Sequence, residues 1–349
     1  MVKDKSVIVV GAGASKEFNL PIGNELLYKI SDAFYKSERG YGISDEIVNS
    51  ALNIYSSRFK VANPSYGYHT LIQTTQSIRK AIPLSISIDN LIDERKSDDV
   101  EVCAKIAIAK KILDAERDST LYLNLSYNQS LNFENSRKTW LNQFFKILKQ
   151  NCEFKNFHER LAQVKFVVFN YDRCIEHYMY YAIQSAYNVT KDEAKECMKS
   201  LDIYHPYGRV GSLPWMGESN PIGFGEDVRP DKLISLIDEL KTFTEGIDKE
   251  ESKISMIRKS IEKANTKLFL GFGYHQLNLD LLYSNGIKHT NSGLTKYFGT
   301  TLGESDSNQS SIHSQLSKLA HISLDQIWLK DMSAFEIIGE YWRELSLSS

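Results

Sequence analysis

The sequence has no long apolar run, few cysteines and no excess of basic residues. None of its apolar runs approaches the roughly 18 residues that cross a bilayer, so we expect no membrane span. Its 42 Lys and Arg residues against 44 Asp and Glu residues give a net charge of −2, which disfavours direct nucleic-acid binding. No small-residue cleavage site follows the first apolar stretch, and we therefore expect a cytoplasmic protein.

The sequence also lacks the common metal-binding and catalytic motifs. Its four cysteines lie far apart and form no CxxC pair, which disfavours a zinc ribbon and a dense disulfide framework. There is no GxSxG nucleophile elbow, HExxH metal pair or GxxxxGKS/T phosphate loop. We therefore expect reduced thiols and no bound metal.

What the sequence does contain is a series of short apolar runs, each followed by a polar turn and a helical pattern. The clearest runs are Ser6–Val10, Lys165–Phe169, Lys267–Leu270 and Lys296–Thr301. The first shows no polar alternation, which is typical of a strand buried on both faces of a parallel sheet. Strands that alternate with helices predict an α/β fold with a doubly wound, mainly parallel, Rossmann-like sheet.

The segment between the first two runs has a different pattern. Residues 102–113 and 140–148 carry apolar side chains at intervals of three and four, and continuous β-branched runs are scarce. We therefore predict a helical insertion subdomain at residues 31–159. Residues 1–30 and 160–349 then form the Rossmann-like domain, which agrees with roughly 150 residues per domain.

The first polar turn, Gly11-Ala12-Gly13-Ala14-Ser15, has the ingredients of a dinucleotide site. Glycines let backbone amides approach a pyrophosphate, and the helix that follows supplies a positive end. The turn lacks the third glycine and the later acidic residue of the usual dinucleotide fingerprint, which disfavours a hydride-transfer enzyme. A tight strand-to-helix turn without a ligand explains this motif equally well.

Two other polar turns are candidates for the same ligand site because of where they stand in the sequence. Asn170 and Asp172 follow the second run, where an Asx turn or a helix N-cap is the alternative interpretation. His205-Pro206-Tyr207-Gly208 can likewise be an ordinary turn with a satisfied imidazole. Together, however, the three turns are expected to meet where a doubly wound sheet binds its ligand.

In their order and spacing these motifs resemble the SIR2-like, sirtuin-related family. The matching elements are Gly11–Ser15, Asn170–Asp172, His205 with Gly208, and Gly271-Phe272-Gly273, and Ser87-Ile88-Asp89 resembles a Ser-Ile-Asp element of the bacterial branch. The resemblance extends over nearly the whole chain through ordered motifs. It implies a Rossmann-type domain that binds NAD.

Departures from the deacylating sirtuins point to one branch of that family. Their two cysteine pairs are missing, and Pro21-Ile22-Gly23-Asn24 stands in place of their Pro-Asp-Phe-Arg segment. A helical insertion instead of a zinc module resembles the bacterial immune branch, whose members split NAD+ into nicotinamide and ADP-ribose. The resemblance therefore implies an NAD+ hydrolase that acts in anti-phage defence by NAD depletion.

The resemblance also implies a role for each matching residue. Asn170 would position the ribose and a water molecule, His205 would act as general base, and Asp172 would accept a hydrogen bond from the nicotinamide carboxamide. Other residues would bind the remainder of NAD: Ser15 and the backbone of Gly11, Ala12 and Gly13 at the phosphates, and Gly271 and Gly273 at the adenosine half. An imidazole with an unperturbed pKa of about 6.5 suits a base at neutral pH.

Two other functions stay open at this point. One is an NAD-dependent protein deacylase, and the other is a non-catalytic module that senses NAD or ADP-ribose derivatives. Unrestrained NAD cleavage would kill the host, and the sequence shows no obvious sensor domain. We therefore expect control by assembly into a homo-oligomer or by a partner defence protein.

Overall fold

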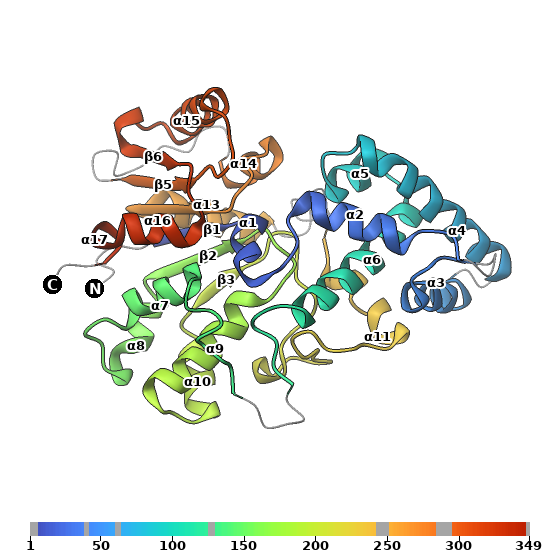
Figure 1. Cartoon of the computed structure of the whole chain (residues 1–349), viewed down its shortest axis with the longest axis horizontal. Coiled ribbons are helices and arrows are strands. Elements are labelled where there is room, and N and C mark those ends of the chain that lie inside the picture. Colours follow the sequence, from blue (N-terminus) through green and yellow to red (C-terminus); the bar gives the residue numbers. More distant parts are fainter. Residues whose placement is uncertain are drawn as a thin grey trace.

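The computed structural model describes residues 6–37, 42–59, 64–124, 130–241, 251–283 and 295–346. Within these residues one parallel sheet forms, with the strand order β3-β2-β1-β4-β5-β6 (Figure 1). The strands are β1 (Ser6–Val10), β2 (Val164–Val168), β3 (Asp202–Tyr204), β4 (Thr266–Leu270), β5 (Lys296–Thr300) and β6 (Ile327–Lys330). The predicted doubly wound α/β fold is confirmed.

The central strand β1 is buried on both faces because helices cover both sides of the sheet. Ile8 and Val10 point into one hydrophobic cluster, whereas Val7 and Val9 point into another. Side chains that alternate along a strand point to opposite faces, so an uninterrupted apolar run is what a doubly covered strand requires.

Helices from three parts of the chain pack in the cluster that contains Ile8 and Val10. They are α7 (Trp140–Lys149), α8 (Phe154–Leu161), α9 (Cys174–Tyr187), α10 (Lys191–Met198), α16 (Ala334–Glu340) and α17 (Trp342–Leu345). Thr190 and Glu193 close the first turn of α10 as a capping box. The predicted insertion thus includes α7 and α8, which are part of a layer that covers the sheet.

The opposite face of the sheet is covered by a second group of helices. One continuous hydrophobic cluster extends from this face to the remaining helices of the predicted insertion. Those on the sheet are α13 (Glu251–Lys263), α14 (Gln276–Leu282) and α15 (Asp306–Ala320). The helices of the insertion are gathered on one side of the molecule in Figure 1 and are α3 (Glu46–Phe59), α4 (Pro64–Ala81), α5 (Ile88–Arg95) and α6 (Asp98–Arg117). Two helices from outside it pack with them, α2 (Gly23–Ala33), most of which precedes the predicted boundary, against α6 and α11 (Pro230–Ile234) against α3. None of the helices in the described residues is long and apolar enough to cross a membrane.

Neither β3 nor β6 is predicted from the sequence. Both are short edge strands, and of the β6 side chains only Ile327 is buried. A half-exposed strand of three or four residues lacks the continuous apolar run that marks the central strands.

Candidate functional site

The sheet order creates a crevice between β1 and β4. The chain leaves β1 toward β2 on one side and leaves β4 toward β5 on the other, and ligands of doubly wound folds bind at such a switch point. A cavity of about 860 Å³ opens at the carboxyl ends of these strands. Its wall includes Gly11, Ala12, Gly13, Asn170, Asp172, Gly271 and Gly273, so the structure brings together seven of the nine predicted site residues.

The two glycine turns contact each other at the floor of this cavity. Gly11 N donates to Leu270 O at 2.9 Å and Gly13 N donates to Gly271 O at 3.0 Å. A Cβ atom on Gly11 or Gly271 would collide with the backbone of the facing turn, and Gly271 also has a φ of +55°. Two of the three predicted phosphate-binding amides, those of Gly11 and Gly13, therefore already donate to backbone oxygens. The third, Ala12 N–H, is at the first position of α1 (Ala12–Ser15), where an amide has no partner within the helix.

Ser15 joins the two polar residues at the end of β2. Its Oγ donates to Asp172 Oδ2 and accepts from Asn170 Nδ2, both at 2.8 Å. An ionised carboxylate can only accept, so the single hydroxyl proton of Ser15 goes to Asp172. This fixes the amide of Asn170 with Nδ2 toward Ser15. Its Oδ1 has no protein partner among the described contacts, on a residue that lines the cavity.

Ser15 itself lies behind the cavity wall and is 5% exposed. Its hydroxyl is engaged on both sides, so in this arrangement it supports Asn170 and Asp172 and does not face a phosphate. Asp172 lines the cavity and closes an Asx turn at the start of α9, because its Oδ1 accepts from Cys174 N at 3.1 Å. Its role toward a ligand stays a prediction.

His205 lies beside Asn170 but is not part of the cavity wall. Its Nδ1 is 3.0 Å from Asn170 O and its Nε2 is 2.8 Å from Glu176 Oε1. Both facing atoms are acceptors when Glu176 is ionised, so each contact requires a proton on the ring nitrogen. Burial raises the pKa of Glu176, but His205 and Arg209 outweigh it and bring that pKa below its ordinary value. Glu176 lies inside the first turn of α9, and no sequence motif marks it as part of a site.

A second contact at the cavity links α5 to the turn after β2. Tyr171 OH donates to Asp89 Oδ1, and both residues line the cavity. Ser87 caps α5, since its Oγ accepts from Asn90 N at 3.1 Å. The Ser87-Ile88-Asp89 element singled out in the sequence therefore starts a helix and reaches the site.

The opposite wall, at the ends of β4 and β5, contains polar atoms without partners. Tyr274 OH and Thr301 Oγ1 are buried and have no hydrogen-bond partner among the described residues. Both residues line the cavity, and Thr301 is 3% exposed. Buried polar atoms are normally satisfied. The Tyr274 hydroxyl lies against Gly299 of β5, so Thr301 Oγ1 is the better candidate of the two to meet a ligand.

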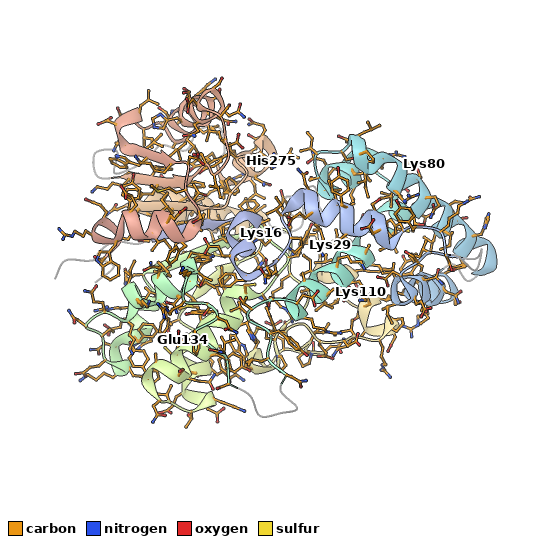
Figure 2. The ribbon with its side chains drawn as sticks, viewed as in Figure 1. Lys16, Lys29, Lys80, Lys110, Glu134 and His275 are labelled. Carbon is orange, nitrogen blue, oxygen red and sulfur yellow. The ribbon has the colours of Figure 1, made fainter. Side chains whose placement is uncertain are left out.

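Two side chains that can carry positive charge also line the cavity. Lys16 follows the first glycine turn and pairs with Glu25, and His275 precedes α14 (Figure 2). These are the groups in the described wall that can attract an anionic ligand.

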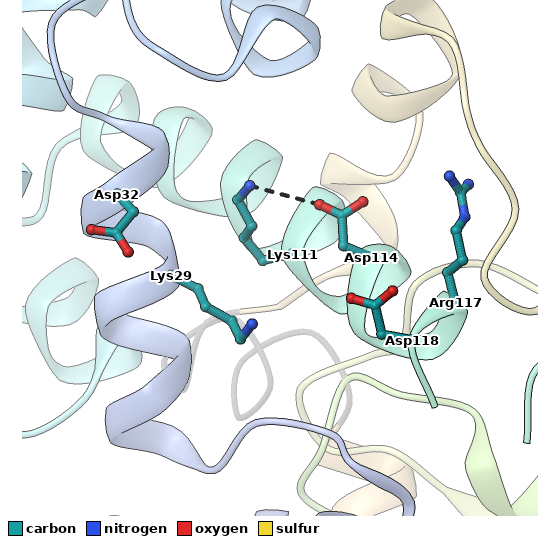
Figure 3. A pocket seen from close by; sticks show the side chains of 6 residues that line it. All are labelled: Lys29, Asp32, Lys111, Asp114, Arg117 and Asp118. Atoms are coloured by element: carbon teal, nitrogen blue, oxygen red, sulfur yellow. Dashed lines mark ion pairs between the residues drawn. The ribbon is translucent and has the colours of Figure 1, made fainter. Parts of the chain in front are cut away.

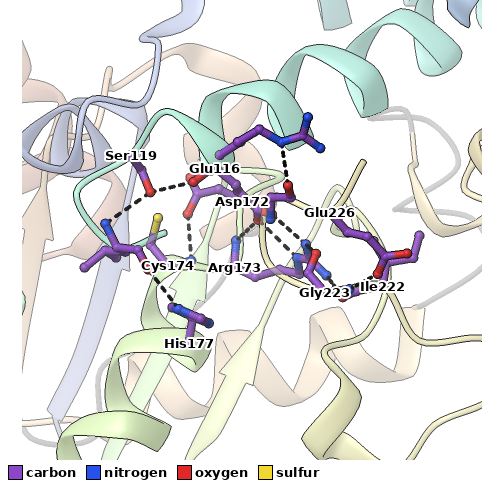
Figure 4. A network of polar contacts seen from close by, with 12 residues as sticks. Glu116, Ser119, Asp172, Arg173, Cys174, His177, Ile222, Gly223 and Glu226 are labelled. Atoms are coloured by element: carbon purple, nitrogen blue, oxygen red, sulfur yellow. Dashed lines mark hydrogen bonds and ion pairs between the residues drawn. The ribbon is translucent and has the colours of Figure 1, made fainter. Parts of the chain in front are cut away.

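A buried ion pair anchors the site from behind (Figure 4). Arg173 Nη2 lies 2.5 Å from Glu116 Oε2, and both side chains are fully buried. Arg173 also donates to the backbone oxygens of Ile222 and Gly223, at 2.6 and 3.0 Å. The network therefore joins α6, the start of α9 and part of the loop at residues 217–230.

A second hollow, of about 430 Å³, lies between α2 and the C-terminal end of α6 (Figure 3). It is lined by Lys29, Asp32, Lys111, Asp114, Arg117 and Asp118. Three cationic and three anionic side chains give it no excess of either sign. The described residues contain no group of three His, Cys, Asp or Glu side chains that could hold a metal ion.

Comparison of the chain with protein-family models, with curated proteins and with solved structures found no match. The resemblance to the SIR2-like family therefore stays a prediction that rests on the motifs. The site geometry described above stands independently of it.

Proposed function

We propose that this protein is an NAD+ hydrolase that releases nicotinamide and ADP-ribose. The observation that carries the proposal is the fixed amide of Asn170, whose Oδ1 is left for a ligand at the wall of the switch-point cavity. An amide oxygen held in one orientation can accept a hydrogen bond from a ribose hydroxyl or from water.

The reaction places specific demands on such a site. Breaking the bond between nicotinamide and ribose develops positive charge on the sugar, as glycoside hydrolysis does. Asn170 would orient the ribose and the attacking water, and the carboxylate of Asp172 would accept from the carboxamide of the departing nicotinamide. Because Ser15 already fixes both side chains, little reorganisation would be needed during the reaction. No metal is required.

His205 would serve as the general base under one condition. Its Nδ1 must leave Asn170 O, while Nε2 keeps its hydrogen bond to Glu176. The carboxylate would then hold the ring in one tautomer and stabilise its protonated form, as an acidic partner does in other histidine bases.

The remainder of NAD+ would lie across the glycine turns. Ala12 N–H and Lys16 would contact the pyrophosphate, and His275 would add positive charge on the far side. The adenosine half would pass over Gly271 and Gly273, where Thr301 Oγ1 has no partner among the described residues.

One observation favours a second candidate, a non-catalytic module that binds NAD or an ADP-ribose derivative. Both ring nitrogens of His205 are engaged with protein atoms, so the proposed base is not free in this arrangement. Saturable binding of NAD+ without turnover would support this function over the hydrolase.

The test is to quantify nicotinamide and ADP-ribose by chromatography after incubation with NAD+. The parent should release both in equal amounts, and Asn170→Ala and His205→Ala should each lose at least about a hundredfold in rate. Asn142→Ala removes a partly buried amide that donates to Tyr178 OH and serves as control. If both site variants equal the parent, the assigned roles are wrong.

In a defence role this activity would need control. We propose that self-association or a partner defence protein supplies it. Gel filtration combined with activity measurements on the fractions tests this, because a fully active isolated monomer would contradict it.

A further inference from the structure

The turn that contains Asn170 and Asp172 is held from two sides. On one side Ser15 bonds both side chains. On the other side the ring of Tyr171 extends to α5, where its hydroxyl donates to Asp89. Tyr171 therefore links this turn to the helical region through α5.

The anchor is enclosed by protein at both ends. Tyr171 is 6% exposed, and its backbone oxygen accepts from Val210 N at 3.0 Å. Asp89 keeps some exposure to the cavity but is otherwise surrounded, and burial raises the pKa of its carboxyl group. Its Oδ1 can accept from Tyr171 in either protonation state, so the link persists over a wide pH range.

We propose that Asp89 is a positioning residue for the site: through Tyr171 it fixes the turn that presents Asn170 and Asp172 to the cavity. The proposal deepens the proposed NAD+ hydrolysis and rests on it for its kinetic part. It gives the Ser87-Ile88-Asp89 element a role, since Ser87 starts α5 and so places Asp89 opposite Tyr171.

The role predicts a loss in turnover and not in substrate binding. Displacing Asn170 by a fraction of an ångström would misplace the ribose in the transition state, whereas the pyrophosphate contacts lie elsewhere in the cavity. For Tyr171→Phe and Asp89→Ala we expect kcat to fall about tenfold to a hundredfold, with KM changed by less than about threefold. The double variant should be no worse than either single variant, because both remove one hydrogen bond.

Two further variants sharpen the experiment. Asp89→Asn keeps an acceptor oxygen for Tyr171 and should retain most of the parent turnover. Tyr68→Phe removes a tyrosine hydroxyl that donates to Asn49 Oδ1 at 2.7 Å in the helical region, and it should match the parent. If Asp89→Asn loses as much as Asp89→Ala, the charge of Asp89 acts directly and the positioning role is overturned. A Tyr171→Phe variant with parent kinetics overturns it as well.

A second readout needs no turnover. Hydrogen exchange followed by mass spectrometry reports on the amides of Cys174 and Val210, which bond to this turn. Exchange should accelerate in Tyr171→Phe and Asp89→Ala but not in Asp89→Asn or Tyr68→Phe. If the exchange rates of these two amides are the same in all variants, the Tyr171–Asp89 hydrogen bond does not hold the turn in place. Accelerated exchange in a protein that does not cleave NAD+ would leave the anchor in place and refute the proposed function.

Discussion

The two walls of the cavity differ in how their polar groups are satisfied. At the ends of β1 and β2, Ser15 bonds to both Asn170 and Asp172, and Asp172 also accepts from the first backbone amide of α9. At the ends of β4 and β5, Tyr274 OH and Thr301 Oγ1 are buried without partners among the described residues. On the first wall the three side chains hold one another before a ligand arrives and leave only Asn170 Oδ1 open, whereas on the second wall the hydroxyl of Thr301 is unpaired.

This difference matters because satisfied and unsatisfied groups respond in opposite ways to mutation. Removing one member of a satisfied buried pair leaves its partner unpaired, which destabilises the fold. Removing an unsatisfied hydroxyl leaves the fold unharmed and affects only a ligand that would have paired with it. The following variants test this distinction.

The largest effect is expected for Ser15→Ala on the satisfied wall. Loss of the hydroxyl frees the amide of Asn170 to rotate, so NAD+ cleavage should fall about a hundredfold, and the free energy of unfolding should fall by about 1–3 kcal/mol. Chromatographic product assays and denaturant unfolding measure the two losses. Ser119→Ala, which removes a buried serine hydroxyl bonded to Glu116 O, is the matched control. Parent-like activity in Ser15→Ala would show that the Asn170 amide does not depend on Ser15.

Glu176→Gln should lower the free energy of unfolding by about 2 kcal/mol at pH 7, because it weakens a buried charged hydrogen bond to His205. In the folded protein the pKa of Glu176 is below the ordinary 4.5. The ionised carboxylate therefore stabilises the fold above pH 4.5, and this stabilisation is lost as the pH falls through the pKa of the folded state. Urea unfolding between pH 3 and 7 should therefore show a weaker acid dependence in the variant. Parallel curves for the variant and the parent would contradict the ion pair.

Thr301→Val tests the unsatisfied wall. The substitution keeps the shape of the side chain, so unfolding should change by less than about 1 kcal/mol, whereas the affinity for ADP-ribose should fall about tenfold. Calorimetric titration measures the affinity. Thr120→Val removes another buried hydroxyl without a partner, outside the cavity wall, and should leave binding unchanged. Equal affinities of both variants would remove Thr301 from the ligand site.

The last prediction concerns stability alone, at Glu17, which lines the cavity and accepts from Trp140 N and Phe335 N at 2.6 and 2.7 Å. Burial raises its pKa to about 7 from the ordinary 4.5. The protonated carboxyl group of Glu17 therefore contributes fully to the free energy of unfolding below pH 4.5, and this contribution is lost as the pH rises through 7. Glu17→Gln should flatten the thermal stability profile in this window. An unchanged profile would mean that the carboxyl titrates normally.

The sequence was sufficient to predict the central strands and the meeting of their polar turns. β1, β2, β4 and β5 each contain a short apolar run, and the carboxyl ends of parallel strands share one edge. The pairing partners were not predictable. The hydroxyl of Ser15 is bonded to Asn170 and Asp172, which are separated from it by 155 and 157 positions in the sequence. The partner of His205, Glu176, lies within a helix. The engagement of Gly11 and Gly13 likewise follows only from the contact with β4.

The position of β1 in the sheet has a consequence for synthesis of the chain. This strand is made first among the strands, yet its two neighbours, β2 and β4, begin at Val164 and Thr266. At translation rates of about 5–20 residues per second, β1 waits on the order of 10 to 50 s for its second neighbour. The floor of the crevice cannot close on a ribosome-bound chain until β4 has emerged, so a growing chain has no crevice between β1 and β4 before that point.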